Sequence, residues 1–153
     1  MILNRSYISK NKDIFYSVAI GNFDGIHLGH RFILNQLKSC KKSKEDRIAV
    51  ITFNPHPIKI LKPSLWKKNL IKFRTKFRLL ENLGVDTLFQ IPFTYDFSNF
   101  NARFFIEDIL IKNIQIKNIL VGEDFRFGKN REGDIRLLTE YAKKNKFNLK
   151  YYK

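Results

Sequence analysis

The stretch FYSVAIGNFDGIHLGHRF, residues 15–32, joins an apolar run, a glycine-bearing turn and the start of a helical pattern. The run at 15–20 is short, apolar and followed by Gly21, which is typical of a buried strand. Four apolar residues then recur at the spacing of one helix face and predict a helix from 28 to about 39: Leu28, Phe32, Ile33 and Leu37. A strand, a turn and a helix in succession open an α/β fold.

The same alternation continues along the chain. Four more apolar runs predict strands at 47–53, 86–91, 116–122 and 148–152. Helical patterns lie between them, from Leu70 to Leu83 with Gly84 as a C-terminal cap, from about 101, and from Asp134, an N-cap, to about 146. The sequence therefore predicts a Rossmann-like, doubly wound parallel sheet of about five strands with helices on both faces.

Three polar segments follow predicted strands. They are the quoted turn at 21–25, NPHP at 54–57 and GEDFRFG at 122–128. In doubly wound sheets, ligands bind beyond the carboxyl ends of the strands, near the point where the strand order reverses. We expect these three segments to form one site there.

The spacing of the histidines indicates phosphate chemistry. Gly21 and Gly25 allow a tight turn and a close approach of the backbone to a ligand. The helix that follows offers free N–H groups and the positive end of its dipole to an anion. His27 and His30 are three residues apart, so they share a helix face and can donate hydrogen bonds to phosphate oxygens. A purely structural role is the alternative, and metal ligation is less favoured because no third ligand lies nearby in the sequence.

Size and composition limit the class of protein. The chain has 153 residues, 44% of them hydrophobic, which suits one folded domain. No apolar run reaches the roughly 20 residues that span a bilayer, and MILNRSYISKNKD lacks the apolar core of a signal peptide. The single cysteine, Cys40, lies late in a helical pattern and is expected to pack rather than react. A cytoplasmic protein with no membrane partner is predicted.

The net charge of +15 has two interpretations. It could attract nucleic acid or phosphate-bearing small molecules. The basic clusters at 38–44, 67–78 and 143–147, however, lie on the polar faces or ends of predicted helices, where solvated charge is ordinary. We favour the second interpretation and expect no specific nucleic-acid partner.

Three motifs carry a resemblance to a known family. GNFDGIHLGH resembles the HxGH signature of the nucleotidylyltransferase superfamily, in the extended form of bacterial FAD synthetases, the adenylyltransferase module of bifunctional riboflavin kinase/FMN adenylyltransferases. TFNPHPIKIL (52–61) resembles the TFxPHP segment of that family, and ILVGEDFRFGKNREGD (119–134) resembles its VGxDFRFGxxxxGD segment. HxGH alone is weakly specific, whereas three motifs in family order are specific.

The resemblance implies a function and a set of site residues. It implies transfer of AMP from ATP to FMN, giving FAD and pyrophosphate, with Mg²⁺ carried mainly on the phosphates and no metal site of the protein's own. His27 and His30 are the implied catalytic residues. The implied ATP-binding residues are Gly21, Asn22, Phe23, Asp24, Gly25, His27, His30 and Arg126, and the implied FMN-binding residues are Asn54, Pro55, His56, Pro57, Asp124, Phe125 and Phe127.

Several of these residues have structural alternatives. Asp24 could make a local Asx-type turn. Phe125 and Phe127 alternate as in a strand, so one is expected in the core and one toward the ligand. Arg126 could pair with Glu123 or Asp124 instead of phosphate. Trp66 is expected in a flap or a surface loop.

The sequence departs from the family pattern in one respect. The family continues into an SSTxxR segment, which holds the triphosphate, and then into a riboflavin kinase domain, and neither is found in residues 1–153. We therefore expect an FMN adenylyltransferase module without that segment, with a separate riboflavin kinase as one candidate partner. The alternatives are another HxGH transferase, making a CDP-alcohol or dephospho-coenzyme A, and a non-catalytic nucleotide- or flavin-binding fragment.

Overall fold

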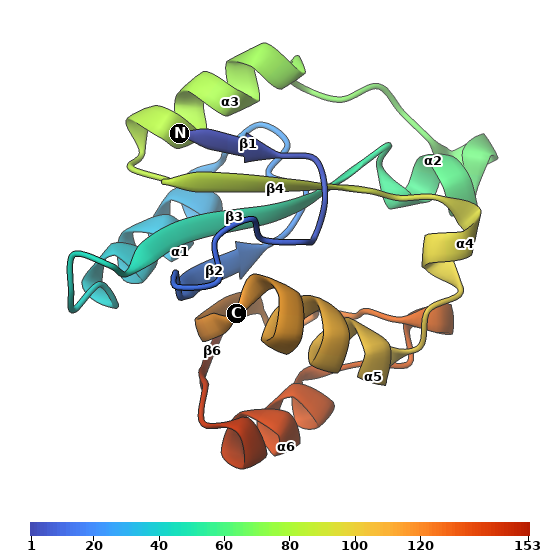
Figure 1. The fold of residues 1–153 in the computed structure, drawn as a ribbon. Coiled ribbons are helices and arrows are strands. Elements are labelled where there is room, and N and C mark those ends of the chain that lie inside the picture. Colours follow the sequence, from blue (N-terminus) through green and yellow to red (C-terminus); the bar gives the residue numbers. More distant parts are fainter.

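A computed structural model describes residues 1–153 as one six-stranded parallel sheet with helices on both faces (Figure 1). The strand order is β1-β4-β3-β2-β5-β6, and every pair of neighbours is parallel. The strands are β1 (Ile2–Asn4), β2 (Tyr16–Ile20), β3 (Arg47–Asn54), β4 (Thr87–Pro92), β5 (Ile116–Gly122) and β6 (Asn148–Tyr152). The α/β, doubly wound class expected from the sequence is confirmed.

The reversal of strand order lies at β2. From β2 the chain proceeds through β3 to β4 on one side, and then returns to β5 and β6 on the other. All five residues of β2 are buried because helices cover both of its faces. The carboxyl ends of β2, β3 and β5 are therefore neighbours, and the three polar segments follow those ends.

Two apolar cores lie on opposite faces of the sheet. Val18 and Ile20 of β2 join one core, and Ala19 joins the other, because successive strand residues point to opposite faces. The first core packs the π-helical segment η2 (Phe105–Ile114) and α6 (Ile135–Asn145) against the sheet. The second packs α1 (Leu28–Ser39) and α3 (Phe73–Asn82), which Figure 1 shows on the other side of the sheet.

Short helices complete the connections: α2 (Pro57–Leu61), η1 (Pro63–Leu65), α4 (Tyr95–Ser98), α5 (Ala102–Phe104) and η3 (Lys129–Arg131). None of these was expected from the sequence except α5, which runs directly into η2 and matches the helix predicted from about 101. Three to five residues are too few to show a helical period.

Most predicted elements are confirmed at their boundaries, with two differences. The helix at 28–39 is found as predicted, Asp134 caps α6 through a bond from the Leu137 N–H, and Gly84 follows α3 with a φ of +81°. The sheet has a sixth strand, the three-residue β1, which was not predicted. The helix expected from Leu70 begins at Phe73, because the backbone just before it is bound elsewhere.

Candidate active site

The turn after β2 is fixed by two inward-pointing side chains. Phe23 and Ile26 have left-handed φ values of 49° and 42°, which are uncommon for residues other than glycine. Their side chains are 1% and 2% exposed, so burial in the core holds this conformation. Gly25, between them, has a φ of 82°. The Phe23 ring is therefore packed in the core rather than exposed to a ligand.

The two histidines stack at the start of α1. His27 is the N-cap residue and makes no side-chain capping bond, so the first N–H groups of the helix have no side-chain acceptor there. The His27 and His30 ring centroids are 3.8 Å apart, and the His30 ring also stacks on Phe23 at 4.5 Å. The buried Phe23 ring thus supports His30, and the exposed His27 ring stacks on His30.

The environment of His30 keeps its ring neutral. Burial is the largest effect, and the charges of His27 and Lys76 add to it, so the pKa falls to about 4 despite the nearby Asp24 carboxylate. Its Nδ1 is buried without a hydrogen-bond partner. At neutral pH, His30 can therefore act as a hydrogen-bond donor or acceptor rather than as a cation.

The segment after β3 contacts the segment after β2. Nδ1 of His56 accepts a 3.1 Å hydrogen bond from the Ile58 N–H and so caps α2, and Nε2 lies 2.6 Å from Nδ2 of Asn22. The ring also lies 5.0 Å from that of Trp66, between centroids, and burial lowers its pKa. Asn22, expected on the ATP side, and His56, expected on the FMN side, are thus brought together.

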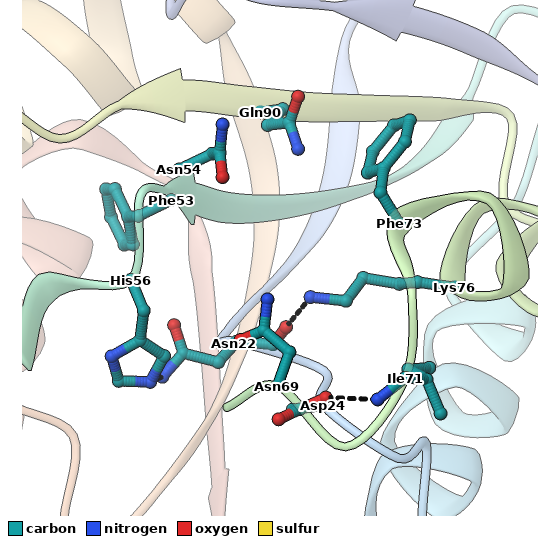
Figure 2. Close-up of a pocket in the computed structure, with 10 residues that line it drawn as sticks. All are labelled: Asn22, Asp24, Phe53, Asn54, His56, Asn69, Ile71, Phe73, Lys76 and Gln90. Carbon is teal, nitrogen blue, oxygen red and sulfur yellow. Dashed lines mark hydrogen bonds between the residues drawn. The ribbon is translucent and has the colours of Figure 1, made fainter. Parts of the chain in front are cut away.

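A pocket opens between these segments and α3 (Figure 2). Four of its lining residues were expected in the site: Asn22, Asp24, Asn54 and His56. Six were not: Phe53, Asn69, Ile71, Phe73, Lys76 and Gln90. Nζ of Lys76 donates a 2.6 Å hydrogen bond to the Asn22 carbonyl oxygen, as Figure 2 shows.

Asp24 binds a distant segment rather than its own turn. Its carboxylate accepts hydrogen bonds from the Leu70 N–H at 2.8 and 3.0 Å and from the Ile71 N–H at 3.2 Å. These bonds span more than 40 residues of sequence, whereas an Asx turn is local. They hold the connection before α3 against the turn and explain why the helix does not begin at Leu70.

The segment after β5 lies apart from this pocket. Phe127 is 7% exposed and belongs to the core, whereas Phe125 is half-buried and stacks on it at 5.4 Å. Phe127 is therefore the buried member of the pair. Arg126 is exposed, its Nη1 bonds to the Phe125 carbonyl oxygen at 3.0 Å, and no salt bridge joins it to Glu123 or Asp124.

Comparison with known proteins identifies the family to which this arrangement belongs. A family model described as FAD synthetase matches residues 9–153. The chain belongs to the FAD synthetase family. The match includes all three motifs and every strand except β1.

Several curated proteins are similar in sequence to this member of the FAD synthetase family. The chain is 39% identical over 124 residues to a bifunctional riboflavin kinase/FMN adenylyltransferase of Buchnera aphidicola, covering 81% of this chain and 40% of that protein. The Escherichia coli K12 protein of the same name is 37% identical over 80% of this chain and 39% of its own length. An FAD synthetase of Listeria monocytogenes is 37% identical over 89% of this chain and 55% of its own length. The chain thus spans about half or less of these relatives.

A solved structure supports the fold of this FAD synthetase family member. A Streptococcus pneumoniae protein described as a macrolide-efflux protein has 25% sequence identity and a TM-score of 0.81. The similarity covers 99% of this chain and 50% of that one.

Few side chains in this FAD synthetase family member are placed to bind a metal ion. No group of three or more His, Cys, Asp or Glu side chains is arranged to hold a metal ion. Asp24, the one carboxylate lining the pocket, already accepts backbone hydrogen bonds. No helix has the length and apolar character that crossing a membrane requires.

Lys76 is the functional candidate that sequence reasoning missed. It was grouped with the basic cluster at 67–78, whose residues were interpreted as a solvated face. Its position in the helix could have revealed it, because Lys76 lies three residues after Phe73 and four before Leu80 and so shares the apolar face of α3 with them. A lysine on the buried stripe of a helix next to a site is not a solvated charge.

Proposed function

We propose that this chain is an FMN adenylyltransferase module, which transfers AMP from ATP to FMN and releases pyrophosphate. Membership of the FAD synthetase family supports the reaction class, and the curated relatives carry this activity in their names. The observation that carries the proposal is the stacked pair of His27 and His30 at the start of α1, directly after the turn at 21–25. Another HxGH transferase activity is disfavoured by the family.

In the proposed reaction, a phosphate oxygen of FMN attacks the α-phosphorus of ATP. A new P–O bond forms, the bond from the α-phosphorus to the pyrophosphate oxygen breaks, and its electron pair leaves with pyrophosphate. Charge accumulates on the leaving group, where hydrogen-bond donors are most effective. The neutral ring of His30, the ring of His27 and the first N–H groups of α1 supply such donors.

Positioning is the other contribution that we assign to this chain. The backbone from Gly21 to Gly25 holds the nucleotide, and Mg²⁺ arrives with ATP as part of the substrate. Residues 54–57 border the flavin together with Asp124 and Phe125 of the segment after β5, and Arg126 of that segment meets an ATP phosphate. Phe127 supports Phe125 from the core. Bringing two anionic reactants together in line accounts for much of the rate in such transfers.

The proposal is tested by incubating the chain with ATP, Mg²⁺ and FMN and separating the flavins by chromatography. We expect FAD to form. Riboflavin with ATP is the matched control, and we expect no FMN from it, because residues 1–153 are proposed to form the adenylyltransferase module alone. FAD formation from FMN together with FMN formation from riboflavin would contradict the proposed domain content.

A further inference from the structure

Lys76 is the one basic side chain, apart from His56, that lines the pocket. It is half-buried, and that burial lowers the pKa of its amine. An ammonium group has three N–H donors, and the Asn22 carbonyl oxygen takes one of them at 2.6 Å. No other acceptor in the protein binds Nζ, so two donors remain for a ligand.

Lys76 also lacks a paired carboxylate. It takes part in none of the salt bridges of the molecule. Asp24 is near enough to raise the pKa of Lys76, but its oxygens are bound to the backbone N–H groups of Leu70 and Ile71. A partly desolvated cation without an ion-pair partner is costly, and an anion that enters the pocket offsets that cost.

Apart from Asp24, whose carboxylate is bound to backbone N–H groups, the other polar groups of the pocket suit an anion that accepts hydrogen bonds. Side-chain amides line it at four positions: Asn22, Asn54, Asn69 and Gln90. Each amide can turn N–H donors toward an oxygen-rich ligand. Two of these residues belong to segments expected on either side of the reaction, Asn22 next to the nucleotide turn and Asn54 at the start of the flavin segment.

We propose that Lys76 binds the phosphate of the flavin substrate and thereby distinguishes FMN from riboflavin. This assignment rests on the proposed function. The flavin phosphate is preferred to an ATP phosphate because Asn54 and His56, from the segment assigned to the flavin, line the same pocket, whereas His27 and His30 do not. Lys76 is close enough to both His30 and His56 for its charge to lower the pKa of each ring.

Phosphate recognition is tested by measuring the affinities of FMN and riboflavin by calorimetry in the absence of ATP. The variants are Lys76→Met, which keeps the length of the side chain, and Lys76→Arg, which keeps the charge. Lys44→Met is the matched control, because Lys44 is exposed and precedes the amino end of β3, whereas the pocket lies at the carboxyl end of that strand. It removes the same charge from a chain of net charge +15 without touching the pocket.

We expect Lys76→Met to weaken FMN binding by roughly 10- to 100-fold, the loss typical of one charge-assisted hydrogen bond. Riboflavin binding should change by about twofold or less. Lys76→Arg should retain most of the preference for FMN, and Lys44→Met should leave both affinities unchanged. FMN affinity should also fall at alkaline pH, before an ordinary lysine deprotonates, whereas riboflavin affinity should not.

Three results would overturn the assignment. The first is unchanged FMN affinity in Lys76→Met. The second is an equal loss of affinity for both flavins, which would indicate that Lys76 only supports Asn22, and the third is an unaltered protein that does not prefer FMN to riboflavin. The proposed function has a separate test. Failure of the unaltered chain to form FAD, with the flavin preference intact, would reject adenylyl transfer and leave Lys76 as a phosphate-binding residue.

Discussion

Replacing His30 by Phe should make the protein less sensitive to acid. The pKa of His30 is about 4 in the folded state, against an ordinary value of 6.5. Between these values, the unfolded chain takes up a proton that the folded chain does not, so stability is lost as pH falls from 6.5 toward 4. The difference corresponds to about 3 kcal/mol at most, and partial exposure of the ring reduces the expected loss to about 1–2 kcal/mol. A phenylalanine keeps the stack on Phe23 and does not titrate.

Two measurements check this prediction. Urea unfolding of both proteins at about pH 7.5 and about pH 4.5 gives the loss of unfolding free energy, which should be about 1–2 kcal/mol greater in the unaltered chain. Proton NMR of the three histidines should show one ring that titrates near 4, and this resonance should be absent from His30→Phe. Equal acid sensitivity in the two proteins, or three rings that all titrate near the ordinary value, would refute the account of His30.

Three further predictions concern the turn, the core and the charge. Asp24→Ala removes the acceptor of the Leu70 and Ile71 N–H groups, so it should lower the unfolding free energy by about 1–3 kcal/mol and speed tryptic cleavage around Leu70. Unchanged cleavage would contradict the conclusion that Asp24 holds this segment in place. Leu34→Ala, in the core, should cost about 2–5 kcal/mol in urea unfolding, whereas Leu28→Ala, at 84% exposed, should cost about 0.5 kcal/mol or less, and similar costs would contradict the placement of α1. Binding to duplex DNA should be weak and should vanish at physiological salt, whereas binding that survives such salt would indicate specific contacts.

The central strands could be predicted because their burial determines their composition. β2, β3 and β5 are covered on both faces and are therefore rich in apolar residues, and a glycine or proline lies at or directly after the end of each. β1 escapes this signal, because three residues at the sheet edge carry no run and no alternation. The sequence predicts the start of α3 three residues too early, because the true start depends on hydrogen bonds to Asp24, which is far away in the sequence.

The motifs of the site could be predicted from the sequence, but the directions in which their side chains point could not. The spacing of His27 and His30 was enough to place the two rings together, and the structure stacks them. Spacing could not show that the Phe23 ring turns into the core or that Phe127 rather than Phe125 is buried, because both depend on packing from the rest of the fold. Lys76 was missed because it reaches the site from a helix that carries no motif.

The central claim is that the histidine pair at the start of α1 drives adenylyl transfer to FMN. The most direct test is the rate of FAD formation from ATP, Mg²⁺ and FMN by the unaltered chain, His27→Ala and His30→Ala, with FMN affinity measured in parallel. We predict that the unaltered chain forms FAD, and that each variant loses on the order of 10²-fold in turnover while keeping its affinity for FMN. Absence of FAD from the unaltered chain, or unchanged turnover in both variants, would contradict the claim.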